Sequence, residues 1–121
     1  MIDVERTDFV SVIVRDLERA KTFYGETLGI RPNTKAHASY PEFETGNLTI
    51  SLRAEADHFT PSRTAIALRV PDVDAARTKL ESVGVAFAGE TFDTGVCHVA
   101  FFGDPDGNAL MLHNRYALVG G

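Results

Sequence analysis

The chain has 121 residues, 44% of them hydrophobic, and a formal net charge of −5, which suits a single compact domain over residues 1–121 with its own core. No apolar run approaches the ~20 residues of a membrane span, the N-terminus lacks the apolar segment of a signal peptide, and the acidic balance disfavours nucleic acid. The one cysteine, Cys97, excludes an intramolecular disulfide and suits a reducing cytoplasm, so we expect a cytoplasmic protein that binds neither membrane nor nucleic acid.

The first half of the chain is predicted to contain one amphipathic helix over 16–28, because apolar residues recur there at helical spacing. Asp16 is a plausible N-cap, since a short carboxylate can accept the first free amide hydrogens of a helix. Gly29 stands where a helix needs a left-handed closing residue. Runs of apolar residues and a Gly-Asn turn predict strands near 8–14, 33–39, 41–45 and 47–53.

The second half repeats this pattern. A second helix is predicted over 72–83, with Asp72 as its N-cap and Gly84 as its closing residue. The pattern predicts strands near 64–70, 85–91, 96–102 and 108–114. A repeat of about half the chain indicates an internal duplication, with a first module over about 7–55 and a second over about 62–116.

Two short motifs, "FYGETLGI" in the first module and "DPDGN" in the second, carry a family resemblance. At this separation they resemble the vicinal oxygen chelate superfamily, which includes glyoxalase I, extradiol dioxygenases and bleomycin resistance proteins. The resemblance covers residues 7–114. It implies an α+β fold of two tandem βαβββ modules, whose mixed, curved sheets enclose a cavity. It implies no particular reaction, because the family includes several chemistries and non-catalytic binders.

Metal-using members of that family place His, Glu or Gln, His and Glu on their first, fourth, fifth and eighth strands. The matching positions here are Phe9, Ser51 (or Thr49 if the register differs by two), Ala65 and Met111. A divalent metal needs three or four imidazole or carboxylate donors, and these residues supply none. We therefore expect no metal site and no cofactor.

Because strand residues alternate between faces, the resemblance also predicts which residues line the cavity. The opposite parity is more uniformly aliphatic and should be the core under the helices. The predicted lining is mostly apolar and aromatic, which is typical of a small-molecule site. The predicted ligand-binding residues are Phe9, Ser11, Ser51, Arg53, Ala65, Ala67, Arg69, Cys97, Phe101, Met111 and His113.

For four of these residues the sequence allows either a functional or a purely structural role. His113 is a candidate acid or base, or a partly exposed histidine near a strand end. Cys97 is a candidate nucleophile if a cation such as Arg69 lowers its pKa, or a small buried hydrophobe. Arg53 and Arg69 either bind a carboxylate or phosphate or point to solvent at strand ends. No set of nucleophile, base and orienting group can be assembled from the sequence, so catalytic residues stay unassigned.

The sequence favours a metal-independent small-molecule-binding protein of the glyoxalase/bleomycin-resistance type. It would sequester or carry an aromatic or planar metabolite or antibiotic, with the charge of that guest left open. The alternative is a lyase, isomerase or dioxygenase with a non-standard active site. The resemblance and the apolar residues on both faces of the first and seventh strands predict a homodimer.

Overall fold

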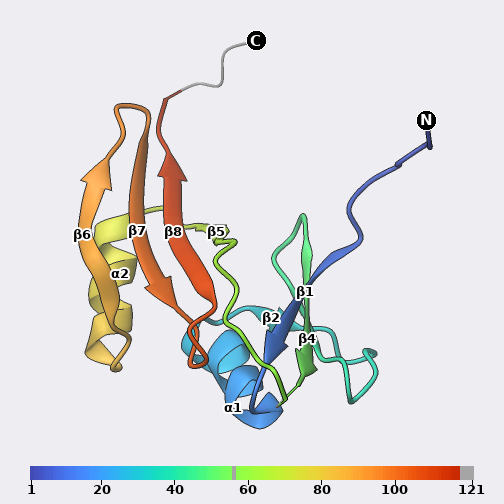
Figure 1. Ribbon diagram of the computed structural model, residues 1–121. Helices are drawn as coiled ribbons and strands as arrows, with labels where there is room; N and C mark the ends of the chain where they lie inside the picture. Colours follow the sequence, from blue (N-terminus) through green and yellow to red (C-terminus); the bar gives the residue numbers. More distant parts are fainter. Residues whose placement is uncertain (56, 118–121) are drawn as a thin grey trace. The chain divides into compact units, whose positions relative to one another are not determined.

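The computed structural model describes residues 1–55 and 57–117, which divide between two compact units, one ending at Pro61 and one beginning at Ser62. Figure 1 labels most of the elements. The first unit contains β1 (Phe9–Val14), α1 (Leu17–Thr22), the π-helical turn η1 (Phe23–Thr27), β2 (Arg31–Pro32), β3 (Glu42–Glu44) and β4 (Thr49–Ala54). The second contains β5 (Ile66–Arg69), α2 (Val73–Ser82), β6 (Phe87–Asp93), β7 (Cys97–Gly103) and β8 (Ala109–Arg115).

The two units have the same sheet topology. One four-stranded sheet has the order β1-β4-β3-β2, and the other has the order β5-β8-β7-β6. In each sheet the first and last strands of the unit are parallel neighbours, and the remaining pairs are antiparallel. This confirms the α+β class and the duplicated βαβββ module. The cavity between the sheets stays a prediction.

The ends of the helices follow the predicted chemistry. The carboxylate of Asp16 accepts a hydrogen bond from the Arg19 amide, and that of Asp72 accepts one from the Ala75 amide, each at 3.0 Å. Gly29 has φ +73° and Gly84 has φ +92°, a conformation that glycine adopts without steric cost. Within the described parts of the chain, no helix has the length and apolar character needed to cross a membrane.

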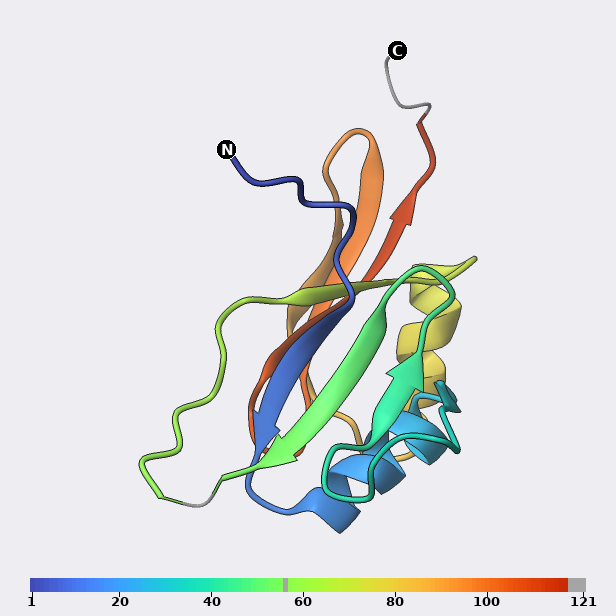
Figure 2. The same ribbon diagram turned by 90° about the vertical axis from the view of Figure 1, so that its right-hand side faces the viewer.

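Each sheet packs its own helix against one face. Figure 2 shows α1 against the sheet that contains β1, β3 and β4. The strand residues on these helix-covered faces are mostly buried, as the alternation predicts, and they form the core: Val12, Val14, Phe43, Ile50, Leu52, Ala100, Phe102, Leu110 and Leu112. We call the opposite face of each sheet its helix-free face.

The "FYG" part of the first motif is explained by packing. Tyr24 is fully buried, and its ring centroid lies 6.2 Å from that of Phe43. A Cβ atom on Gly25 would lie 3.0 Å from the edge of the Phe43 ring. A side chain at this position would therefore press on the Phe43 ring, because interiors are close-packed.

The "DPDGN" motif builds a tight turn around a buried carboxylate. Asp104, which is 5% exposed, accepts hydrogen bonds at Oδ1 from the amides of Asp106 and Asn108, at 2.9 and 3.0 Å. Its Oδ2 accepts one from Nδ2 of Asn108 at 2.9 Å. The side-chain oxygen of Asn108 accepts one from the amide of Ser62 at 2.8 Å. The motif thus ties the start of the second unit to its last hairpin.

The predicted strand over 33–39 is wrong. The strand is only Arg31–Pro32, and the residues after it form turns. The side chain of Asn33 accepts a hydrogen bond from the Lys35 amide, and Nδ1 of His37 accepts one from the Ser39 amide, each at 3.0 Å. Such local side-chain bonds compete with strand pairing for the backbone.

Candidate functional site

The helix-free face of the second sheet gathers most of the predicted ligand-binding residues of the second unit. Met111 pairs with Ala67 on β5 and with Phe101 on β7, and His113 pairs with Arg69 and Val99. Cross-strand partners share one face of a sheet, so these side chains are neighbours. The predicted residues on this face are Ala67, Arg69, Cys97, Phe101, Met111 and His113. Ala65 directly precedes β5 and is half-buried.

One end of this face is aromatic. The rings of Phe92 and Phe101 are stacked, with centroids 5.9 Å apart and planes at 26°. Phe92 is 46% exposed and Phe101 36% exposed, so both offer ring surface to a guest. Flat exposed rings favour planar aromatic partners. Phe92 is not among the predicted ligand-binding residues, none of which comes from the strand predicted over 85–91 or from the residues just after it.

The other end of this face is cationic. Nη1 of Arg69 donates a hydrogen bond to the main-chain oxygen of Arg115 at 3.4 Å. Nη1 of Arg115 lies 3.9 Å from Sγ of Cys97, a thiol whose residue is 6% exposed. Arg69 was the cation expected near Cys97, whereas the cation in contact with the thiol is Arg115. The strand predicted over 108–114 ended one residue before it.

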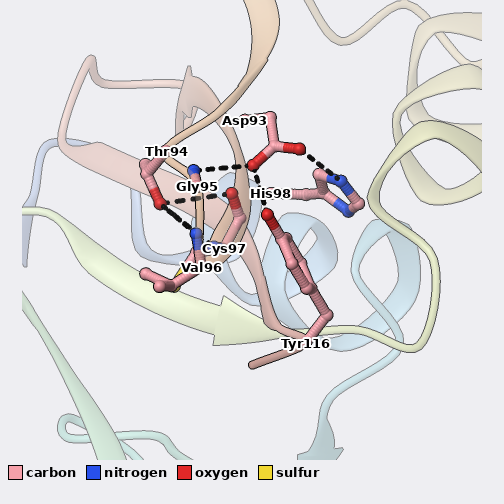
Figure 3. Close-up of polar contacts among 7 residues, drawn as sticks. All are labelled: Asp93, Thr94, Gly95, Val96, Cys97, His98 and Tyr116. Atoms are coloured by element: carbon pink, nitrogen blue, oxygen red, sulfur yellow. Dashed lines mark hydrogen bonds and ion pairs between the residues drawn. The ribbon is translucent and has the colours of Figure 1, made fainter. Parts of the chain in front are cut away.

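A polar network closes the hairpin between β6 and β7 (Figure 3). Oδ1 of Asp93 accepts hydrogen bonds from the Tyr116 hydroxyl at 2.7 Å and from the Gly95 amide at 2.8 Å. Its Oδ2 lies 3.5 Å from Nε2 of His98, on the surface. The hydroxyl of Thr94 accepts a hydrogen bond from the Cys97 amide at 3.0 Å. The network holds the chain after β8 against this hairpin and fixes the start of β7, where Cys97 lies.

The Tyr116 hydroxyl, followed by the Gly95 amide, lowers the pKa of Asp93, because both donate hydrogen bonds that favour the ionised carboxyl. The bond to Asp93 in turn raises the pKa of Tyr116. The stability contributed by ionised Asp93 is therefore present above the ordinary carboxyl pKa of about 3.9 and is lost as the pH falls through the lowered value.

Replacing Tyr116 by phenylalanine should raise the pKa of Asp93 towards its ordinary value, because the strongest donor to the carboxylate is removed. A titration of side-chain carboxyl carbons by NMR measures this change. The difference in thermal stability between Y116F and the parent should be present at neutral pH and shrink in acid. Tyr40→Phe, at an exposed tyrosine of the first unit, is the matched control. An unchanged Asp93 pKa in Y116F would show that the network does not form in solution.

The helix-free face of the first sheet carries the other predicted residues. Phe9 is 54% exposed, Ser11 is exposed, and Ser51 is 7% exposed. Arg53 lies near the end of β4 and forms an exposed ion pair with Glu55 at 3.6 Å.

Two carboxylates of the first unit share this face. Glu44 accepts a hydrogen bond from the Thr49 hydroxyl at 2.7 Å, and Glu42 accepts one from Nδ2 of Asn33 at 3.0 Å. Both glutamates are half-buried. Neither glutamate is among the predicted site residues, although each is paired across the sheet with Ser51 or Thr49, which the family resemblance had singled out.

The positions that hold metal in the resembling family do not fit a metal here. Phe9 pairs directly with Thr49, Ser51 lies two residues further along β4, and Met111 lies on β8. None has an imidazole or carboxylate to donate. Within residues 1–55 and 57–117, no three His, Cys, Asp or Glu side chains converge in a way that would hold a metal ion.

Comparisons with known proteins agree with this fold. A family model described as Glyoxalase/Bleomycin resistance protein/Dioxygenase superfamily matches residues 6–112. TnmS3, an antibiotic binding protein from Streptomyces sp. CB03234, is 28% identical with a TM-score of 0.79, over 95% of this chain and 99% of that one.

Two further solved structures are similar. A glyoxalase/bleomycin resistance protein from the same Streptomyces strain is 31% identical with a TM-score of 0.73, over 89% of this chain and 99% of that one. A glyoxalase family protein from Bacillus anthracis is 24% identical with a TM-score of 0.79, over 95% and 98% of the two chains.

Proposed function

The chain belongs to the Glyoxalase/Bleomycin resistance protein/Dioxygenase superfamily, and from that premise we propose that it binds a planar or aromatic small molecule without a metal ion. The observation that carries the proposal is the exposed stack of Phe92 and Phe101 on the helix-free face of the second sheet. Exposed aromatic faces beside a few polar groups are typical of small-molecule sites. The guest would be a metabolite or an antibiotic that the protein sequesters or carries.

Two further observations support this function. The positions that would hold the family's metal carry Phe9, Thr49 or Ser51, Ala65 and Met111, so the binding energy has to come from apolar, aromatic and charged contacts. Relatives that are 28% and 31% identical are described as an antibiotic binding protein and as a glyoxalase/bleomycin resistance protein. Both descriptions are consistent with small-molecule binding as the function of this chain.

A thermal-stabilisation screen tests the proposal. The full chain is heated with a set of two- and three-ring planar compounds, once in EDTA and once with added Zn²⁺, Ni²⁺ or Mn²⁺. We expect at least one compound to raise the melting temperature by the same amount in both conditions, because a ligand that binds only the folded state stabilises it. Stabilisation only with a metal, or by no compound in either condition, would contradict the proposal.

We also propose that the protein is a homodimer. In the first sheet β1 is an edge strand, and edge strands offer unpaired backbone groups to a neighbour. Phe9, at the start of that strand, is 54% exposed. Sedimentation velocity at micromolar concentration tests this assembly, and a single monomer peak would remove it.

A further inference from the structure

The cationic end of the helix-free face of the second sheet has no acidic counterpart among the strand-paired positions. Arg69, His113 and Arg115 lie there on two neighbouring strands. In the described strands of this sheet, no position paired with them on that face carries Asp or Glu. Asp93, at the nearby hairpin, is already bonded to Tyr116 and Gly95. Arg69 reaches the main chain of Arg115, and neither of the two guanidinium groups has a paired carboxylate at these strand positions.

One donor of the Arg115 guanidinium has no acceptor among residues 1–55 and 57–117. Its Nε atom is buried, and no acceptor in the described residues reaches it. Its Nη1 atom lies 3.9 Å from the sulfur of Cys97, and sulfur is a weak acceptor. Buried polar atoms are rarely left without a partner. An anionic oxygen next to the guanidinium would supply strong acceptors in the planar geometry that arginine matches.

The aromatic and cationic ends are spaced for one molecule. Phe101 pairs with Met111, and Met111 precedes Arg115 by four residues on β8. At about 3.3 Å per residue, Phe101 and Arg115 are roughly 13 Å apart along the strand. Phe92, opposite Val99, lies in the same cross-strand row as His113 and Arg69, so Phe92 and Arg69 are three strand spacings, roughly 14 Å, apart across the sheet. The long side chains of Arg69 and Arg115 shorten the gap to the stacked rings. A guest of two or three fused rings with one acidic group has a matching length.

We propose that the guest is a planar aromatic acid, with its rings at Phe92 and Phe101 and its carboxylate at Arg69 and Arg115. This inference rests on the proposed function. It adds that the guest is an anion and that Arg69 and Arg115 bind its charged group. The ring stack supplies contact area, and the two guanidinium groups select the anion over neutral or cationic molecules of the same shape.

Three probes with the same ring system test the charge selection: 2-naphthoate, neutral 2-naphthamide and the 2-naphthylmethylammonium cation. Each is titrated into the ¹⁵N-labelled full chain in EDTA, and the dissociation constant is taken from amide shifts. We expect 2-naphthoate to bind about tenfold more tightly than 2-naphthamide, a difference typical of a charge-assisted hydrogen bond. The cation should bind most weakly.

Single-residue variants test whether Arg69 and Arg115 cause the preference for the anionic probe. Arg69→Met and Arg115→Met should each lower the affinity for 2-naphthoate about threefold to tenfold. Each should leave the affinity for 2-naphthamide within twofold of the parent. Lys79→Met, which removes a positive charge from α2, should change neither. Arg69 is exposed, so R69M is expected to keep its fold, and the dispersion of the amide spectrum checks both variants.

The outcomes separate this inference from the function on which it rests. Equal binding of 2-naphthoate and 2-naphthamide at Phe92 and Phe101, unchanged in R69M and R115M, would overturn the charge assignment and keep aromatic binding. Equal weakening of both probes in a folded R69M would also overturn it, since that pattern reports a structural role. No shift with any of the three probes would contradict both this inference and aromatic binding at this face.

Discussion

Replacing Asp104 by alanine is expected to lower the free energy of unfolding by about 3 kcal/mol, since hydrogen bonds to a charged group contribute about 1.5–3 kcal/mol each and are not additive. The variant leaves the amides of Asp106 and Asn108 and the side-chain amide of Asn108 without their acceptor. The site is 5% exposed, so water cannot easily replace it. Urea denaturation followed by circular dichroism measures the change.

Asp104→Asn is the matched variant for this prediction. The remaining carbonyl oxygen can still accept from the two backbone amides, whereas the new NH₂ group would face the NH₂ group of Asn108. D104N should therefore lower the free energy of unfolding by less than D104A does, by about 1–2 kcal/mol. A D104A protein as stable as the parent would show that the "DPDGN" turn does not depend on its first carboxylate.

Replacing Phe101 by alanine is expected to weaken binding of a planar ligand about tenfold to a hundredfold. The estimate of about 1.5–3 kcal/mol combines lost apolar contact with a lost ring stack. Phe101 is only 36% exposed and stacks on Phe92, so F101A also loses covered apolar area, and the melting temperature of the free variant is measured beside the affinity. Calorimetric titration of the best compound from the stabilisation screen measures the affinity.

Phe87→Leu is the control for this variant, because Phe87 lies on the neighbouring strand β6, opposite Phe102 and next to the partner of Phe101, but belongs to the helix-covered face. Its ring lies 5.0 Å from Phe102 and under the guanidinium of Arg77 at 4.8 Å. F87L should therefore lower stability and leave the affinity within twofold. If F87L weakens the ligand and F101A does not, the ligand is bound on the other side of the sheet.

The duplicated topology and the core could be predicted from the sequence because their signals are local and occur twice. Asp16 and Asp72 cap their helices, and Gly29 and Gly84 take the positive φ that closes them. The alternation of apolar residues predicts which face each helix covers. The strand over 33–39 was predicted wrongly because the turn there depends on a local bond, in which the side chain of His37 accepts a hydrogen bond from the Ser39 amide. Such a bond does not change the pattern of apolar and polar residues from which strands are predicted.

The candidate site was predicted less completely than the fold, for a physical reason. Phe92 and Arg115 each lie one residue beyond a predicted strand, and both lie on the face that carries the candidate site. Where a strand ends is decided by its pairing partners, such as Cys97 opposite Arg115, and not by its own residues. Tyr116 was missed in the same way, because its bond to Asp93 depends on the hairpin that brings them together.

The central claim is that the helix-free face around Phe101 binds a planar molecule without a metal. The most direct test is a map of amide shifts in the full chain, recorded in EDTA, with the best compound from the stabilisation screen. We predict the largest shifts at Phe92, Val99, Phe101 and Met111, with the same affinity after a divalent metal is added. Shifts confined to α2 and the helix-covered face, or binding that disappears in EDTA, would contradict the claim.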